Sequence, residues 1–260
     1  MTYSYDLKVV VSGKQVEVFK YTKHIWRDFN KKQFENSKPQ KEPKQLTTSE
    51  QLEIKKQKMK FSFNRTKTEI RRLTNTNPQL NKFMTLTFAE NIIDLKEANY
   101  IFNQFIKRIS YKYPNFEYLA VPEFQKRGAV HYHLLCKLPF VEIIKLQELW
   151  GQGFLKINKI DNVNNVGAYV CKYLSKDMFD ERTFGKKKFF RSQSLSESIE
   201  LIGYYANIFI EKFLSILSPV FEKKFESEWL GEVEYKAYSL DFFPFNPTNP
   251  KSRKLNHFIV

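Results

Sequence analysis

The chain has 260 residues and carries 43 Lys and Arg against 28 Asp and Glu, a formal net charge of +15 at pH 7. Its residues are 42% hydrophobic and 16% aromatic, which excludes a disordered basic tail because such a chain can bury a core. No run of about 18 apolar residues occurs, so we expect no membrane span, and the N-terminus lacks a secretory signal pattern. Two cysteines, Cys136 and Cys171, cannot form a disulfide scaffold. We therefore expect a basic, globular, cytoplasmic protein.

The excess positive charge is concentrated in one stretch. Residues 31–72 carry 13 basic and 5 acidic side chains, a net +8, whereas residues 201–260 carry 7 of each. Such a stretch is typical of an arm that binds a polyanion, and equally of a solvated lysine-rich linker. We expect three parts: an N-terminal hairpin and basic arm over 1–72, a central domain over 73–200, and a C-terminal segment of unassigned role over 201–260.

The first half of the chain predicts a hairpin, a helix and the start of a sheet. Apolar alternation over residues 4–23, around a Ser-Gly-Lys turn, predicts the hairpin, and the polar stretch 28–47 predicts a loop. A charged helix is expected over 49–73, with an interruption near 61–64. Residues 83–88 read as a strand, and an apolar stripe over 94–111 predicts an amphipathic helix.

The second half continues the same alternation of strands and helices. Strands are expected over 116–123, 129–136 and 154–160, helices over 141–150 and 163–180, and a further strand within 186–191. The order β-α-β-β-α-β-α predicts an α+β fold with a split β-α-β plan, similar to ferredoxin and RRM domains, with helices packed on one face of an antiparallel sheet. Phe61, Phe63 and Tyr111 are expected in the core rather than stacked on bases.

Two histidines in the second of these strands are candidate metal ligands. His131 and His133 are two residues apart, so both point to the same face of the strand. Glu123 ends the preceding strand, and a hairpin would bring it within reach of both. Two imidazoles and one carboxylate leave coordination positions open for water and substrate, and this donor set fits Mn²⁺ or Mg²⁺. The alternative is a pair of surface histidines at a sheet edge, while Cys136 is expected in the core.

The predicted helix over 163–180 carries a second cluster of reactive side chains. At about 100° per residue, two phenols and two ammonium groups occupy one arc of about 100°. A neighbouring cation makes a phenolate easier to form, and lysine stabilises charge on a phosphate. The alternative is an amphipathic helix with an ordinary polar face. The four residues are Tyr169, Lys172, Tyr173 and Lys176.

Taken in order, these motifs resemble those of the rolling-circle replication initiators of the HUH endonuclease superfamily. The Phe-Met-Thr-Leu-Thr-Phe strand comes first, then Glu123 with His131-Tyr132-His133, then the Tyr-x-x-Lys-Tyr-x-x-Lys pattern of the two-tyrosine phage and plasmid type. Tyr132 stands where the superfamily has a bulky apolar residue. The histidines precede the tyrosines, whereas relaxases usually show the reverse order. The resemblance covers roughly residues 60–200.

The resemblance implies an enzyme that nicks and rejoins single-stranded DNA at a replication origin. It assigns the metal to Glu123, His131 and His133, and the attack on the phosphodiester to a tyrosine, which leaves a 5′-phosphotyrosyl link and a free 3′-hydroxyl. It also implies single-stranded or hairpin origin DNA as partner, in a bacterial cell that carries the plasmid or phage. Host helicase and DNA polymerase are further expected partners, because the chain has no phosphate-binding loop. Expected catalytic residues are Tyr169, Tyr173, Lys172 and Lys176, and expected DNA-binding residues are Lys126, Arg127, Arg65, Arg71 and Arg72.

Two other functions remain open from the sequence. The first is a non-catalytic DNA-binding regulator that keeps the fold. The second is an HUH transposase or relaxase, which shares the nuclease chemistry.

Overall fold

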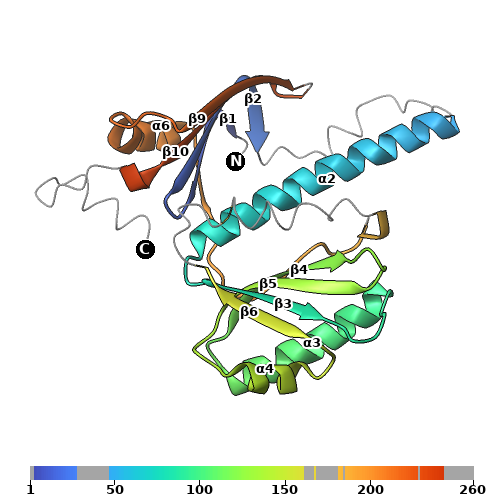
Figure 1. The fold of residues 1–260 in the computed structure, drawn as a ribbon. Helices are drawn as coiled ribbons and strands as arrows, with labels where there is room; N and C mark the ends of the chain where they lie inside the picture. Colours follow the sequence, from blue (N-terminus) through green and yellow to red (C-terminus); the bar gives the residue numbers. More distant parts are fainter. Residues whose placement is uncertain are drawn as a thin grey trace, which may run out of the picture. The chain divides into compact units, whose positions relative to one another are not determined.

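The computed structural model describes residues 3–27, 47–160, 167, 181–183, 185–227 and 229–242. The chain divides into two compact units, one made of residues 1–47 with 197–260 and the other of residues 48–196. This division differs from the three parts expected with boundaries at 72 and 200. The reason is strand pairing, because the N-terminal hairpin forms one sheet with strands that follow residue 197. Figure 1 shows the elements of both units.

The first unit is a five-stranded antiparallel sheet with helical turns on one face. The predicted hairpin is confirmed as β1 and β2, which meet at Gly13 with a φ of 56°. Apolar residues of β1 and β2, among them Val9 and Val16, pack with Phe209 and Phe213. In sheet order the strands are β8 (Ile199–Ile202), β1 (Tyr3–Ser12), β2 (Gln15–Arg27), β10 (Gly231–Ser239) and β9 (Phe221–Ser227); the helical elements are α6 (Gly203–Phe209), η2 (Ile210–Leu214) and η3 (Leu240–Phe242).

The second unit contains the predicted split β-α-β sheet. Every pairing in it is antiparallel, and the consecutive strands β3, β4, β5 and β6 lie in the order β6-β3-β5-β4, with β7 added beside β4. This order is the one that two β-α-β units produce when the strands of each enclose a strand of the other. The α+β prediction is therefore confirmed. The strands are β3 (Lys82–Thr87), β4 (Glu117–Phe124), β5 (Val130–Lys137), β6 (Leu155–Lys159) and β7 (Phe190–Arg191).

Two helices cover one face of this sheet, α3 (Leu95–Lys112) and α4 (Ile143–Trp150). Phe102 of α3 stacks on Tyr132 of β5 with ring centroids 4.2 Å apart, and the Tyr132 hydroxyl donates to Asn99 Oδ1 at 2.7 Å. Asp94 caps α3 by accepting from the Lys96 backbone N–H at 2.8 Å. Tyr132 thus turns away from the histidines on either side of it and joins the core, as does Cys136.

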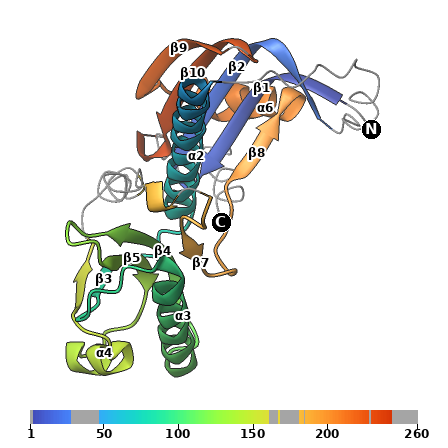
Figure 2. The same ribbon diagram turned by 90° about the vertical axis from the view of Figure 1, so that its right-hand side faces the viewer.

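The long helix α2 (Thr48–Thr76) packs on the opposite face of the same sheet, so the prediction of helices on one face only was wrong (Figures 1 and 2). Its buried stripe, including Phe63 and Ile70, contacts Leu119 of β4 and Leu135 of β5. The predicted interruption near 61–64 does not occur, because Phe63 faces the core from within a continuous helix. Phe63 is buried as expected, but Phe61 and Tyr111 are 74% and 92% exposed, which corrects their placement in the core.

The remaining described element of this unit is the short helix η1 (Glu181–Thr183). The predicted helix over 163–180 lies outside the described residues except for Gly167, and so does most of the expected loop over 28–47. None of the helices among the described residues has the length and hydropathy of a membrane span.

Candidate functional site

Strand register brings the predicted metal ligands together on the sheet face that α2 shares. Glu123 of β4 lies directly opposite His131 of β5, as the hairpin between them predicts. On the other side of β5, Thr87 lies opposite His131 and Thr85 opposite His133. Directly opposed residues in an antiparallel pair have Cβ atoms about 5 Å apart. The carboxylate, the two imidazoles and two hydroxyl groups therefore form one polar cluster.

His133 is held by contacts on both ring nitrogens. Its Nε2 contacts Glu123 Oε2, and its Nδ1 lies 3.2 Å from Thr85 Oγ1. The Phe83 ring stacks on the imidazole at 5.6 Å between centroids and 20° between planes. Since Glu123 accepts from the Nε2–H, the Thr85 hydroxyl is assigned as the donor to Nδ1. The positions of Phe83 and Thr85 depend on the β3–β5 register, which no local sequence pattern reveals.

His131 has a different environment although it lies only 6.2 Å from His133 between ring centroids. Its Nε2 is buried and has no hydrogen-bond partner among the residues that the structure describes. Burial lowers its pKa to about 4, a shift that His133 reinforces and Glu123 opposes. His131 is therefore neutral at pH 7, with a nitrogen that lacks a protein partner, as a metal-ligating imidazole requires.

The fit of this cluster to a divalent cation is good in donor type and incomplete in arrangement. Two imidazoles and a carboxylate share one face, and the buried Nε2 of His131 is unsatisfied. Against this, no group of three or more His, Cys, Asp or Glu among the described residues is arranged to hold a metal ion. The contact between Glu123 and His133 explains the difference, because it pairs two of the three donors with each other.

The turn between β4 and β5 is tied to the end of β3 by Arg127. Its Nη2 donates to the Phe88 carbonyl at 2.9 Å and its Nε to Gln125 Oε1 at 2.8 Å. Gly128 completes the turn with a φ of 92°, a conformation that favours glycine. The guanidinium expected on DNA is thus partly engaged within the protein, whereas Lys126 is exposed.

The expected catalytic residues Tyr169, Lys172, Tyr173 and Lys176 lie outside the described residues. The nearest described position is Gly167, two residues before Tyr169 in the sequence. Its N–H donates to Asn75 Oδ1 of α2 at 3.0 Å, and a Cβ at this position would lie 2.5 Å from the Arg71 carbonyl oxygen. Only glycine fits so close an approach to a helix backbone.

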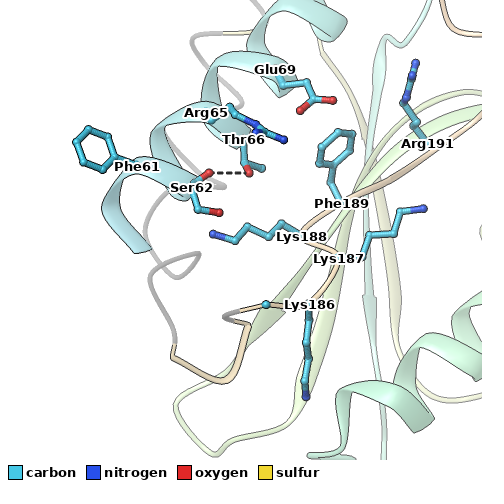
Figure 3. Close-up of a pocket in the computed structure, with 11 residues that line it drawn as sticks. Phe61, Ser62, Arg65, Thr66, Glu69, Lys186, Lys187, Lys188, Phe189 and Arg191 are labelled. Carbon is cyan, nitrogen blue, oxygen red and sulfur yellow. Dashed lines mark hydrogen bonds between the residues drawn. The ribbon is translucent and has the colours of Figure 1, made fainter. Parts of the chain in front are cut away.

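The expected DNA-binding arginines Arg65, Arg71 and Arg72 all lie on α2 but differ in exposure. Arg65 is exposed, while Arg71 and Arg72 are partly buried. Arg65 also lines a cavity between α2 and residues 185–191, in which three consecutive lysines, 186 to 188, take part (Figure 3). The sequence analysis read this lysine run only as part of a strand. Its position in the sequence beside a short strand was the available signal, but the wall that α2 supplies comes from more than a hundred residues away.

The comparison with known families identifies the central segment. Residues 81–178 match the model of the ORF2-type replication-associated protein family, and this match includes Glu123 and both histidines. This segment is of the ORF2 replication-associated type. The family is consistent with a rolling-circle replication initiator, as the motifs suggested. No curated protein and no solved structure matches the chain.

Proposed function

We propose that this ORF2-type replication-associated chain nicks and rejoins single-stranded DNA at a replication origin, by attack of a tyrosine on a phosphodiester. The observation that carries the proposal is the joint placement of Glu123, His131 and His133 on one sheet face, with the buried Nε2 of His131 unsatisfied. This chemistry needs a divalent cation, Mn²⁺ or Mg²⁺, and these three residues would hold it. When bound, the cation polarises the scissile phosphate and stabilises the departing oxygen.

The protein side chains have separate tasks in this scheme. Thr85 and Phe83 fix the orientation of His133, which points its Nε2 toward Glu123. His131 stays neutral because it is buried, so that its Nε2 lone pair is available at pH 7. Each of these roles is filled before substrate arrives.

The nucleophile is Tyr169 or Tyr173, and Lys172 and Lys176 would position the phosphate. The phenol oxygen forms a bond to phosphorus and releases its proton, while the bond from phosphorus to the 3′ oxygen breaks and that oxygen takes up a proton. The products are a 5′-phosphotyrosyl protein and a free 3′-hydroxyl, and the reverse reaction rejoins the strand. The 3′-hydroxyl would prime host DNA polymerase, with host helicase opening the duplex.

The test uses labelled single-stranded oligonucleotides that tile the DNA element encoding the chain, incubated with Mn²⁺. We expect one oligonucleotide to be cut and a protein–DNA adduct to survive denaturation. Adduct formation should be lost in Tyr169→Phe/Tyr173→Phe and in His131→Ala/His133→Ala. Lys107→Gln, an exposed change on α3 across the sheet, serves as the matched control and should leave adduct formation unchanged. Adduct in the double tyrosine variant would refute the nucleophile.

A non-catalytic DNA-binding regulator is the second candidate. One observation favours it: the described residues hold no ready metal-ligand group, since Glu123 contacts His133. The same experiment separates the two functions. Sequence-selective binding without cleavage, under every divalent cation tried, would establish the regulator instead.

A further inference from the structure

A basic cavity lies on the same sheet face as the histidines, within the unit formed by residues 48–196. It opens between α2 and residues 185–191 and has a volume of about 630 Å³. Pockets for small organic ligands measure about 300–1,000 Å³. Figure 3 shows the Phe189 ring between its two walls, with Arg65 and Lys188 reaching into the gap and Phe61 pointing away from it.

The charges in this cavity call for an anion. Arg65 comes from α2 and Lys188 from the opposite wall, and neither forms an ion pair with another described residue. Burial lowers the pKa of Lys188, since its ammonium group loses water without gaining a counter-charge. A phosphate between these two cations would supply that counter-charge through charge-assisted hydrogen bonds.

The rest of the lining calls for more than phosphate. The partly buried Phe189 offers an aromatic ring inside the cavity, and Glu69 places a carboxylate on the α2 wall. A carboxylate repels an anion but accepts hydrogen bonds from the N–H groups on the edge of a nucleobase. A ligand with a phosphate, a flat apolar face and edge N–H donors satisfies all three features, and a nucleotide has this combination.

Strand register relates the cavity to the histidine cluster. Arg191, at the cavity wall, pairs with Leu119 of β4, and Glu123 lies four residues further along the same strand on the same face. At about 3.3 Å per residue the two positions are about 13 Å apart. Stacked DNA rises about 3.4 Å per nucleotide, so roughly four nucleotides span this distance. One strand can therefore occupy both places.

We infer that the cavity between α2 and residues 185–191 is a site for one unpaired nucleotide of the DNA strand that reaches the histidine cluster. Arg65 and Lys188 hold its phosphate, Phe189 stacks on its base, and Glu69 accepts from the base edge. This inference rests on the proposed function for its choice of DNA as the strand. It adds a base-contacting site outside the cleavage centre.

The test is photocrosslinking of the full chain to a dodecamer of 5-iodo-deoxyuridine. A homopolymer has no unique register, so the result does not depend on knowing the origin, and chelator is present throughout to prevent cleavage. We expect the adduct to map, by mass spectrometry, to the peptide that contains Phe189. Thymidine monophosphate should compete with this adduct at least about tenfold better than inorganic phosphate at equal ionic strength.

Variants separate a nucleotide site from general attraction to a basic surface. Phe189→Leu should lower the yield of this adduct at least about tenfold, and so should Lys188→Gln, which leaves the ring in place if Phe189→Leu does not fold. The control Lys107→Gln removes one cation from the opposite face of the sheet and should change nothing. Equal competition by inorganic phosphate, or adducts confined to other peptides, would overturn the inference.

The two proposals fail in different experiments. A chain that forms the Phe189 adduct but cuts no oligonucleotide keeps the nucleotide site and loses the nicking function. A chain that cuts DNA but crosslinks only elsewhere keeps the function and loses this site.

Discussion

At the scale of single residues, His131 and His133 show how two neighbours of one type acquire different properties. The strand places both on one face, but only His133 has partners on both nitrogens, while His131 keeps a buried and unsatisfied Nε2 among the described residues. Thr85 is the residue that makes the difference, since its hydroxyl is the described partner of His133 Nδ1. Partners of this kind orient metal ligands and set which nitrogen carries the proton.

Removal of that hydroxyl should weaken metal binding without unfolding the protein. We expect Thr85→Val to lower Mn²⁺ affinity by about 10- to 100-fold, because the His133 ring loses the contact that fixes its orientation. Isothermal titration of the metal measures this effect. Thr87→Val is the matched control, since Thr87 lies on the same strand and no hydrogen bond of its hydroxyl is found among the described residues. Equal affinity of both variants and wild type would show that Thr85 does not act through His133.

At the scale of elements, the sheet around the histidines was largely predictable and α2 was not. The strands over 83–88, 116–123 and 129–136 were expected within one residue at each end, because alternating apolar residues and turn residues mark them locally. The Glu123–His131 pairing followed from the short turn that joins β4 to β5. In α2 the lysines dilute the apolar period, so the buried stripe that includes Phe63 was read as an interruption.

Phe61 and Phe63 provide a direct test of how α2 packs. Phe63→Ala should destabilise the protein by about 3–5 kcal/mol, since it removes a ring that is 5% exposed and packs in the core on this face. Phe61→Ala should change the free energy of unfolding by less than about 0.5 kcal/mol, because that ring is 74% exposed. Chemical denaturation of both variants measures the contrast. Similar losses would mean that α2 is rotated from the orientation described.

Glu117 at the start of β4 links three parts of this unit through its carboxylate. Ser194 Oγ donates to it at 2.7 Å, Gln79 Nε2 donates at 3.2 Å, and Lys137 Nζ lies 3.5 Å away. The hydrogen bond from Ser194 is the largest cause that lowers the pKa of Glu117 below its usual 4.5, against the opposing effect of burial. The folded state therefore binds this proton more weakly than the unfolded state does.

A carboxyl group with a lowered pKa stabilises the fold above its unfolded pKa and loses that effect as the pH falls. The difference in unfolding free energy between wild type and Glu117→Gln should thus be constant near neutral pH and shrink as the pH falls below about 4.5. Denaturation at a series of pH values measures it. Glu148→Gln, which changes an exposed carboxyl on α4, should show no such dependence. A difference independent of pH would show that Glu117 acts through packing alone.

At the scale of the whole molecule, the net charge of +15 predicts DNA binding that depends steeply on salt. Each cation that contacts a phosphate of single-stranded DNA contributes about 0.7 to the slope of log affinity against log salt concentration. Arg65→Gln should therefore reduce the slope by about 0.7, whereas Lys107→Gln should leave it unchanged. Fluorescence anisotropy with an oligonucleotide between 50 and 200 mM salt (roughly the range in which such slopes are measured) gives both values. Equal slopes would remove Arg65 from the phosphate contacts.

The order of the strands has a consequence for how the chain is made. The unit over 48–196 is inserted between the two halves of the other sheet, so β2 cannot pair with β10 until roughly 200 further residues have been synthesised. At about 5–20 residues per second this takes roughly 10–40 s. The inserted unit holds all five strands of its own sheet and can fold within that interval. During synthesis, the segment with the histidine cluster is therefore complete while the edge of the N-terminal hairpin still waits for its neighbour.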